Sequence, residues 1–254
     1  MPRRNLVIDP ELGRLTDDYL TRDVRVLQRE KGHRFSSDDV VTAYVAHQAR
    51  PRARRILDMG TGLGSVLLQL AWKQPEAELC GVEAQQQSFQ LLSRNVARSG
   101  FSERVRVLHG DLRDESLMAS LGEFELVTGT PPYFPPPAAL VAEDEQRAFA
   151  RLEYRGGIEA YIHAGARRLS ESGTLVLCGD ARALQRLTSA AAAARLFVHA
   201  RCDVLPREGR APLFSVWTLG AAPQSCHVTE LTLRSGSGEP SADAAALRAF
   251  GGFC

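Results

Sequence analysis

The chain has 254 residues but no long hydrophobic run, few lysines and almost no net charge. No apolar stretch reaches the length of about 18 residues that a membrane-spanning helix needs, and the opening Met-Pro-Arg-Arg-Asn lacks the apolar core of a signal peptide. We therefore expect a soluble, cytoplasmic protein with no membrane partner. The 31 basic and 30 acidic residues nearly cancel, which excludes a strong overall attraction to nucleic acid.

Cysteine and histidine are also sparse. The five cysteines are odd in number, widely spaced and never form a CxxC pair, which argues against a disulfide framework or a zinc site. Cys80 and Cys178 lie in apolar, strand-like runs, so we expect them to be small core residues. The histidines show no ligand spacing, and we expect no metal.

What the chain does have, after residue 54, is a regular alternation of short apolar runs and amphipathic stretches. This pattern is typical of an α/β fold with a mostly parallel sheet. We expect strands near residues 55–58, 78–83, 105–108, 124–128, 174–178, 197–204, 213–219 and 227–233. We expect helices near residues 65–73, 85–99, 157–169, 181–195 and 242–253.

The segment before residue 54 follows a different pattern. Residues 24–28 and 33–35 flank Lys31-Gly32 and predict a hairpin. Asp38 or Asp39 is then placed to cap a helix that ends near His47. We therefore expect an N-terminal hairpin and helix extension over residues 1–50, followed by a main domain over residues 51–254.

A glycine-rich turn follows the first strand of the main domain. The run from Asp58 through Thr61 places Gly60, Gly62 and Gly64 at alternate positions, where backbone can adopt positive φ and approach a ligand closely. The spacing differs from the GxGxxG of dinucleotide binders. It suits a ligand without a pyrophosphate, such as S-adenosylmethionine. Alternatively, the glycines serve only to allow a tight turn. NAD is the alternative ligand.

Two acids follow the next two strands. Glu83 ends the second strand, where a carboxylate could accept hydrogen bonds from both hydroxyls of a ribose. Asp111 follows the third strand, where it could accept from the amino group of an adenine. The alternatives are a charge at the following helix N-terminus for Glu83 and an Asx-turn for Asp111. The glycine turn beside them favours the ribose role for Glu83.

The fourth strand ends abruptly in Thr130-Pro131-Pro132-Tyr133-Phe134. Because proline has no N–H and a fixed φ, the carbonyl of Pro131 is held stiffly and can accept a hydrogen bond from a planar amine. Tyr133 offers a stacking face, which contributes about 1–3 kcal/mol per nucleic-acid base. A rigid strand exit is the structural alternative. The arrangement favours a site for a flat, amine-bearing acceptor, bordered by Pro132 and Phe134.

Together these motifs resemble the class I methyltransferase superfamily from about residue 38 to residue 219. The resemblance implies a Rossmann-like fold with a seven-stranded, mostly parallel sheet whose last strand is antiparallel. It also implies S-adenosylmethionine as the cofactor. The cofactor site would comprise Asp58, Gly60, Thr61, Gly62, Gly64, Glu83 and Asp111.

The run Thr130 to Tyr133 is similar to the NPPY motif of amino-methyltransferases, with Thr130 in place of Asn or Asp. In that motif Thr130 and Pro131 would orient the amine and Tyr133 would stack on it. Three interpretations of Thr130 stay open. The activity is retained with Thr as the acceptor, the acceptor is instead a protein glutamine or a small molecule, or a cofactor-binding protein has lost turnover.

Both ends of the chain resemble the bacterial valine-tRNA adenine-N6 methyltransferases. The similar stretches are residues 28–41, the Ala-Arg-Leu-Glu run at residues 150–153, and residues 241–250. The resemblance implies adenine N6 in tRNA as the methyl acceptor, and we expect a monomer. Within it, Arg34, Phe35 and Asp38 would border a pocket, although Phe35 is more typical of a core residue. Further arginines would flank the acceptor mouth: Arg151, Arg155, Arg207 and Arg210.

Overall fold

The computed structural model describes residues 5–134 and 144–253, so Cys254 lies outside the described residues. The strands are β1 (Asn5–Asp9), β2 (Gly13–Tyr19), β3 (Arg25–Arg29), β4 (Arg55–Met59), β5 (Glu78–Glu83), β6 (Val105–His109), β7 (Phe124–Gly129), β8 (Leu169–Gly179), β9 (Phe197–Leu205), β10 (Phe214–Gly220) and β11 (His227–Thr232). The α-helices are α1 (Ser37–Ala49), α2 (Ser65–Lys73), α3 (Gln86–Arg98), α4 (Glu115–Ala119), α5 (Glu145–Arg151), α6 (Ile158–Ala166), α7 (Leu184–Ala193) and α8 (Ala242–Phe250). Two short 3-10 helices are η1 (Glu153–Arg155) and η2 (Ala181–Ala183).

The central sheet has the strand order β11-β9-β10-β8-β7-β4-β5-β6. β10 pairs antiparallel with both β8 and β9, whereas the other pairings in the sheet are parallel. The expected Rossmann-like α/β fold with an antiparallel last strand is therefore confirmed, except that the sheet has eight strands rather than seven. The additional strand is β11, which pairs with β9 at the edge of the sheet.

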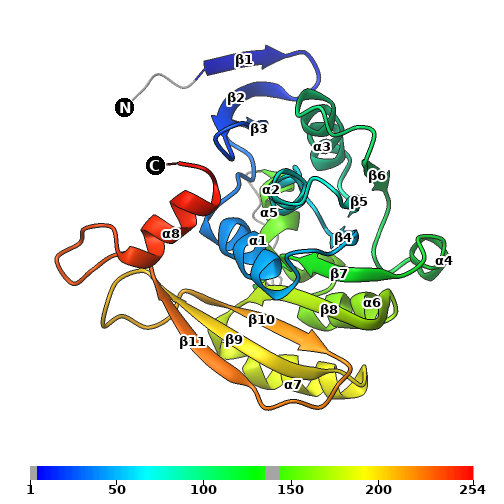
Figure 1. Cartoon of the computed structure of the whole chain (residues 1–254). Helices are drawn as coiled ribbons and strands as arrows, with labels where there is room; N and C mark the ends of the chain where they lie inside the picture. The colour runs from blue at the N-terminus through cyan, green and yellow to red at the C-terminus, as the bar shows by residue number, and fades with distance from the viewer. Residues whose placement is uncertain (1–4, 135–143, 254) are drawn as a thin grey trace.

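Helices cover both faces of this sheet, as Figure 1 shows. One hydrophobic cluster joins the apolar sides of α1, α2, α3 and α8 to the sheet, and a second joins α4, α6 and α7 to its other face. Leu57 and Val127 point into the second cluster while their neighbours Ile56 and Leu126 point into the first. This alternation follows from the period of two along a strand and explains why consecutive residues at the centres of β4 and β7 are apolar.

The N-terminal segment forms a separate three-stranded antiparallel sheet, β1-β2-β3, which lies beside α3 at the top of Figure 1. The expected hairpin across Lys31-Gly32 is wrong, because β3 pairs with β2 instead. Residues 33–35 form no strand, and the backbone N–H of Phe35 donates to the Gln28 side chain at 3.1 Å. Neither β1 nor β2 was expected.

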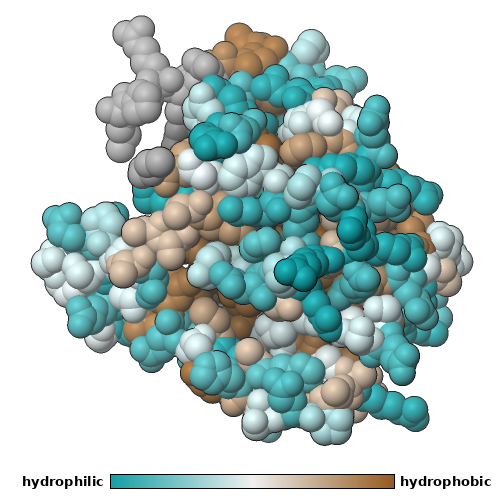
Figure 2. Space-filling view, viewed as in Figure 1, coloured by the Kyte–Doolittle hydropathy of each residue, from teal (hydrophilic) through white to brown (hydrophobic). Residues whose placement is uncertain are grey.

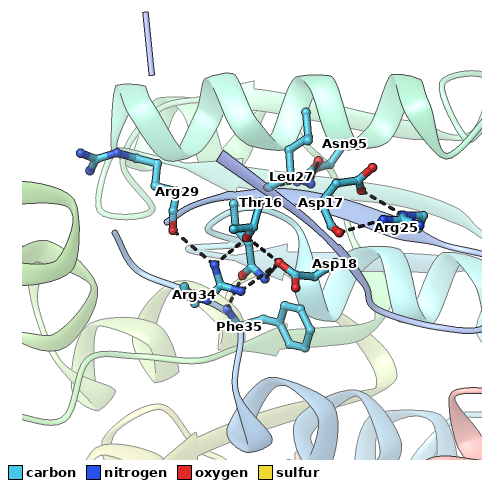
Figure 3. Close-up of polar contacts among 10 residues, drawn as sticks. Thr16, Asp17, Asp18, Arg25, Leu27, Arg29, Arg34, Phe35 and Asn95 are labelled. Atoms are coloured by element: carbon cyan, nitrogen blue, oxygen red, sulfur yellow. Dashed lines mark hydrogen bonds and ion pairs between the residues drawn. The ribbon is translucent and has the colours of Figure 1, made fainter. Parts of the chain in front are cut away.

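Polar side chains attach this small sheet to the segments that surround it (Figure 3). Arg34 donates to Thr16 at 2.7 Å and to Asp18 at 2.9 Å, which anchors the segment before α1 to β2. Asn95 of α3 is fully buried; its side chain accepts from the Leu27 N–H at 2.7 Å and donates to the carbonyls of Leu27 and Leu63. One amide therefore joins β3, α3 and the glycine turn.

The expected core positions of Cys80 and Cys178 are confirmed, since both thiols are buried. The surface seen in Figure 2 is largely hydrophilic, with a hydrophobic patch over β1, where Leu6, Val7 and Ile8 are exposed. In the described ranges, no helix combines the length and the apolar character needed to cross a bilayer.

Candidate cofactor and acceptor site

Four parallel strands end at one cavity, which we call the cofactor cavity. Its lining includes Gly60, Thr61 and Gly62 after β4, Glu83 at the end of β5, Asp111 after β6, and Thr130 and Pro132 after β7. Ligands of open α/β sheets bind in this place, outside the carboxyl ends of the strands. The structure thus brings most of the proposed cofactor residues to one surface.

The three positions of the turn require glycine for different structural reasons. Gly60 and Gly62 both adopt positive φ, +60° and +58°, which disfavours any side chain. A Cβ on Gly60 would also lie 2.0 Å from the Tyr161 hydroxyl, so Gly60 makes room for a protein side chain. A Cβ on Gly62 would have no atom within 4 Å, so this side of its backbone faces open space in the cavity. Gly64 packs inward, with Leu92 nearest to it.

Glu83 is buried and fixed by the backbone. Its two carboxylate oxygens accept from the N–H of Gly62 at 2.8 Å and the N–H of Gln85 at 2.7 Å. Burial raises the pKa of Glu83, and no basic side chain of the described residues forms an ion pair with it. Each carboxylate oxygen can accept a further hydrogen bond. Glu83 and the open space at Gly62 therefore fit a ligand with two hydroxyl donors.

Asp111 also lines the cavity, but its carboxylate forms an ion pair with Arg113. Its carboxylate accepts from Arg113 at 2.7 Å. Burial works to raise the pKa of Asp111, but the hydrogen bonds from Arg113 outweigh it and the net pKa is lowered. Arg155 lies across the same cavity, with its guanidinium 4.4 Å from the ring centroid of Phe149. Arg155 thus borders the cofactor cavity rather than the acceptor mouth where we expected it.

Asp58 is placed differently from our expectation, since it is not among the cavity-lining residues. Its carboxylate accepts from the hydroxyl of Thr61 and from that of Thr128 at 2.7 Å. Burial raises the pKa of Asp58 to about 6. Asp58 therefore holds the glycine turn against β7, and any effect it has on a ligand is exerted through Thr61.

The proline run borders a second cavity, the acceptor cavity, lined by Thr130, Pro131, Pro132, Tyr133 and Phe134. Tyr133 is half-buried, with its hydroxyl 2.7 Å from Asp38. Phe134 is 49% exposed, so it is the more open of the two aromatic rings.

The strand exit is fixed from the other side by α5 and η1. The N–H of Phe134 donates to the carbonyl of Arg151 at 3.1 Å, and the Phe134 carbonyl accepts from Glu153 at 2.9 Å. Arg34, Arg147 and Arg151 line the acceptor cavity, whereas Arg207 and Arg210 line neither cavity.

The two cavities meet at the same side chains. Thr130 and Pro132 line both, as do four residues from two other segments: His33, Phe35, Asp39 and Ala150. Sequence reasoning missed His33 and Asp39 as site residues. Asp39 was expected only as a helix cap, and it has this role in part: the N-cap of α1 is Ser36, and Asp39 closes a capping box by accepting from the Ser36 N–H at 2.9 Å. The adjacent acidic residues Asp38 and Asp39 were the feature of the sequence that could have indicated a site here.

Comparison with known proteins identifies relatives of the chain. A family model described as a methyltransferase domain matches residues 56–148. A protein of Pasteurella multocida named tRNA1(Val) (adenine(37)-N6)-methyltransferase is 31% identical over 68% of this chain and 71% of its own length. A relative of the same name from Porphyromonas gingivalis is 34% identical, but the match spans only 64% of that relative.

Solved structures agree on the fold. A structure from Agrobacterium tumefaciens described as a predicted O-methyltransferase superposes with a TM-score of 0.63 at 20% identity, covering 84% of this chain and 96% of that one. A ribosomal protein L11 methylase from Lactobacillus delbrueckii superposes with a TM-score of 0.56 at 13% identity, covering 82% and 99%. The chain therefore belongs to the S-adenosylmethionine-dependent methyltransferases, in the family of the relatives named tRNA1(Val) (adenine(37)-N6)-methyltransferases.

Proposed function

We propose that this protein methylates the exocyclic N6 amine of an adenine in tRNA. The supporting observation is the junction of the two cavities at Thr130 and Pro132. A methyl donor held over the glycine turn and a flat amine held by the proline run would meet there. In-line positioning of two reactants supplies a large part of the rate in such a transfer.

Each side chain has a definite task in this proposal. Glu83 would hold the ribose of the cofactor, and the backbone at Gly62 would lie beside its aminoacyl end. When bound, S-adenosylmethionine supplies an electrophilic methyl group. The Pro131 carbonyl and the Thr130 hydroxyl accept hydrogen bonds from the amine, which directs its lone pair toward the methyl carbon. Tyr133 and Phe134 offer aromatic faces for the base.

The choice of RNA rests on the relatives' names and on the rim of the acceptor cavity. Lys31, Arg147 and Arg151 line this cavity and are exposed. Cations in such a place position a nucleic acid through its phosphates without reading its sequence. An adenine in folded RNA must leave its stack to enter the cavity, and the aromatic faces compensate for the stacking that it loses.

The test is methyl transfer in vitro with labelled S-adenosylmethionine. Bulk tRNA and a tRNA-free protein extract are offered separately, and the labelled tRNA is digested and analysed by mass spectrometry. We expect label in tRNA as N6-methyladenosine. Label in protein alone would refute the RNA assignment. Binding of S-adenosylhomocysteine without transfer to either would indicate a cofactor-binding protein that has lost turnover.

A further inference from the structure

The amine that the proposed reaction methylates has two N–H groups, and the proline run offers few acceptors for them. Pro131 supplies a stiff carbonyl. Thr130 supplies a hydroxyl, which is short and has to orient its own proton. Among the described residues that line both cavities, Asp39 is the one with a carboxylate. It lies where the methyl donor and the amine would meet.

Asp39 is held firmly at this junction. It sits in the first turn of α1, is 7% exposed, and accepts a hydrogen bond from the Ser36 N–H at 2.9 Å. Ser65, at the start of α2, is a further hydrogen-bonding partner. None of the ion pairs formed by described residues includes Asp39. A buried carboxylate without a cation is costly, and such groups cluster at functional sites.

We propose that Asp39 is a catalytic residue that accepts a hydrogen bond from the target amine beside Thr130 and takes the proton released in methyl transfer. The inference rests on the proposed function. A bond forms from the amine nitrogen to the methyl carbon as the carbon–sulfur bond breaks, and the electron pair of that bond stays on sulfur. The nitrogen then gives one proton to the Asp39 carboxylate, which passes it to solvent through the acceptor cavity.

The electrostatic surroundings agree with a proton acceptor near neutral pH. Burial and then the neighbouring Asp38 raise the pKa of Asp39 to about 7, and Asp58 from β4 adds to the increase. Among the described residues that line both cavities, His33 is the one with a basic side chain, and burial lowers the pKa of His33. The rate of transfer should therefore rise with pH through about 7, as Asp39 ionises.

The test compares Asp39→Ala, Thr130→Asn and the double variant. Asp39→Ala should lower kcat by about 100-fold, the usual scale for loss of one catalytic hydrogen-bonding group, with unchanged affinity for S-adenosylhomocysteine. Thr130→Asn restores a full amide acceptor, so it should recover at least about tenfold of the loss in the Asp39→Ala background. Asp39→Asn should abolish the pH dependence near 7. Asp114→Ala, which removes the capping carboxylate of α4, is the matched control and should leave kcat unchanged.

A binding measurement decides the question without turnover. An RNA stem-loop with adenine at the target position is compared with one carrying purine, which lacks the amine, both with S-adenosylhomocysteine present. The wild type should prefer adenine, and Asp39→Ala should remove the preference. The inference is refuted if the preference is absent or survives in the variant, or if Asp39→Ala weakens S-adenosylhomocysteine binding instead. Absence of tRNA methylation by the wild type would refute the proposed function. The preference for the adenine stem-loop over the purine stem-loop would still test whether Asp39 contacts the amine.

Discussion

The phenol hydroxyl of Tyr133 donates a hydrogen bond of 2.7 Å to the carboxylate of Asp38. Tyr133 comes from the exit of β7 and Asp38 from the first turn of α1, so the bond joins two segments that are 95 residues apart. The sulfur of Cys178 lies 3.1 Å from the same hydroxyl. These contacts fix the hydroxyl end of the Tyr133 ring, and Tyr133 lines the acceptor cavity.

Replacing Tyr133 by Phe removes this anchor but keeps the ring. We expect kcat/KM for tRNA to fall about tenfold, because Asp38 loses a partner and the ring can rotate. Tyr133→Ala should lose in addition about 1–3 kcal/mol of stacking with the base. Steady-state kinetics with tRNA measures both, with Tyr19→Phe on the exposed face of β2 as the control. Equal activity of Tyr133→Phe and the wild type would show that the anchor is dispensable.

Glu83→Gln tests the cofactor cavity. An amide keeps one acceptor but turns a donor toward the N–H of Gly62 or Gln85, both of which now donate to Glu83. We expect the Kd for S-adenosylhomocysteine to rise by about 10- to 100-fold by calorimetry. Glu78→Gln, at the exposed start of β5, should bind like the wild type. An unchanged Kd for Glu83→Gln, with a native circular dichroism spectrum, would contradict the assignment of Glu83.

Asp58 predicts a pH dependence of stability. Its folded pKa of about 6 lies above the ordinary value of 3.8, so between these values the folded chain binds more protons than the unfolded chain. The stability that this supplies is complete below the ordinary pKa and is lost as the pH rises through about 6. The free energy of unfolding of the wild type should therefore fall relative to that of Asp58→Asn, by on the order of 2–3 kcal/mol across this interval.

Urea unfolding of both proteins at an acidic and a neutral pH measures the difference, and subtraction removes the titration of other groups. If the two proteins keep the same difference at both pH values, Asp58 does not titrate in this interval.

The rim of the acceptor cavity predicts a salt dependence. Arg147 and Arg151 lie one helical turn apart on α5 and are exposed. If each contacts a phosphate, its replacement by Ala should weaken tRNA binding and lower the slope of log K against log salt by about 1. Fluorescence anisotropy over a salt series gives the slope. Arg106→Ala on β6 is the control, and an unchanged slope for Arg147→Ala and Arg151→Ala would exclude phosphate contacts there.

Much of the fold could be predicted from the sequence, because the strands and helices after residue 54 follow a local periodicity of apolar residues. The helix over 65–73 and the strand over 78–83 appear with the same bounds, and β10 is antiparallel as the resemblance implied. The eighth strand was expected near 227–233, but its pairing with β9 depends on a long-range register that periodicity does not encode.

The N-terminal sheet was missed for a related reason. Residues 6–8 of β1 are apolar but exposed, so they show no alternation between buried and solvent-facing positions. In the site, the motifs led to the residues around both cavities. They did not lead to Asp39, nor to the inward-facing role of Asp58. The surroundings of these two carboxylates depend on which neighbours each meets after folding.

The buried amide of Asn95 has a consequence for how this fold can be divided or fused. The Asn95 side chain forms hydrogen bonds with the main chain of both Leu27 and Leu63. Deletion of β1, β2 and β3 would therefore leave one N–H and the oxygen of this buried amide without partners, next to the glycine turn. A chimera that includes the central sheet and both cavities must therefore also include the three-stranded sheet β1-β2-β3.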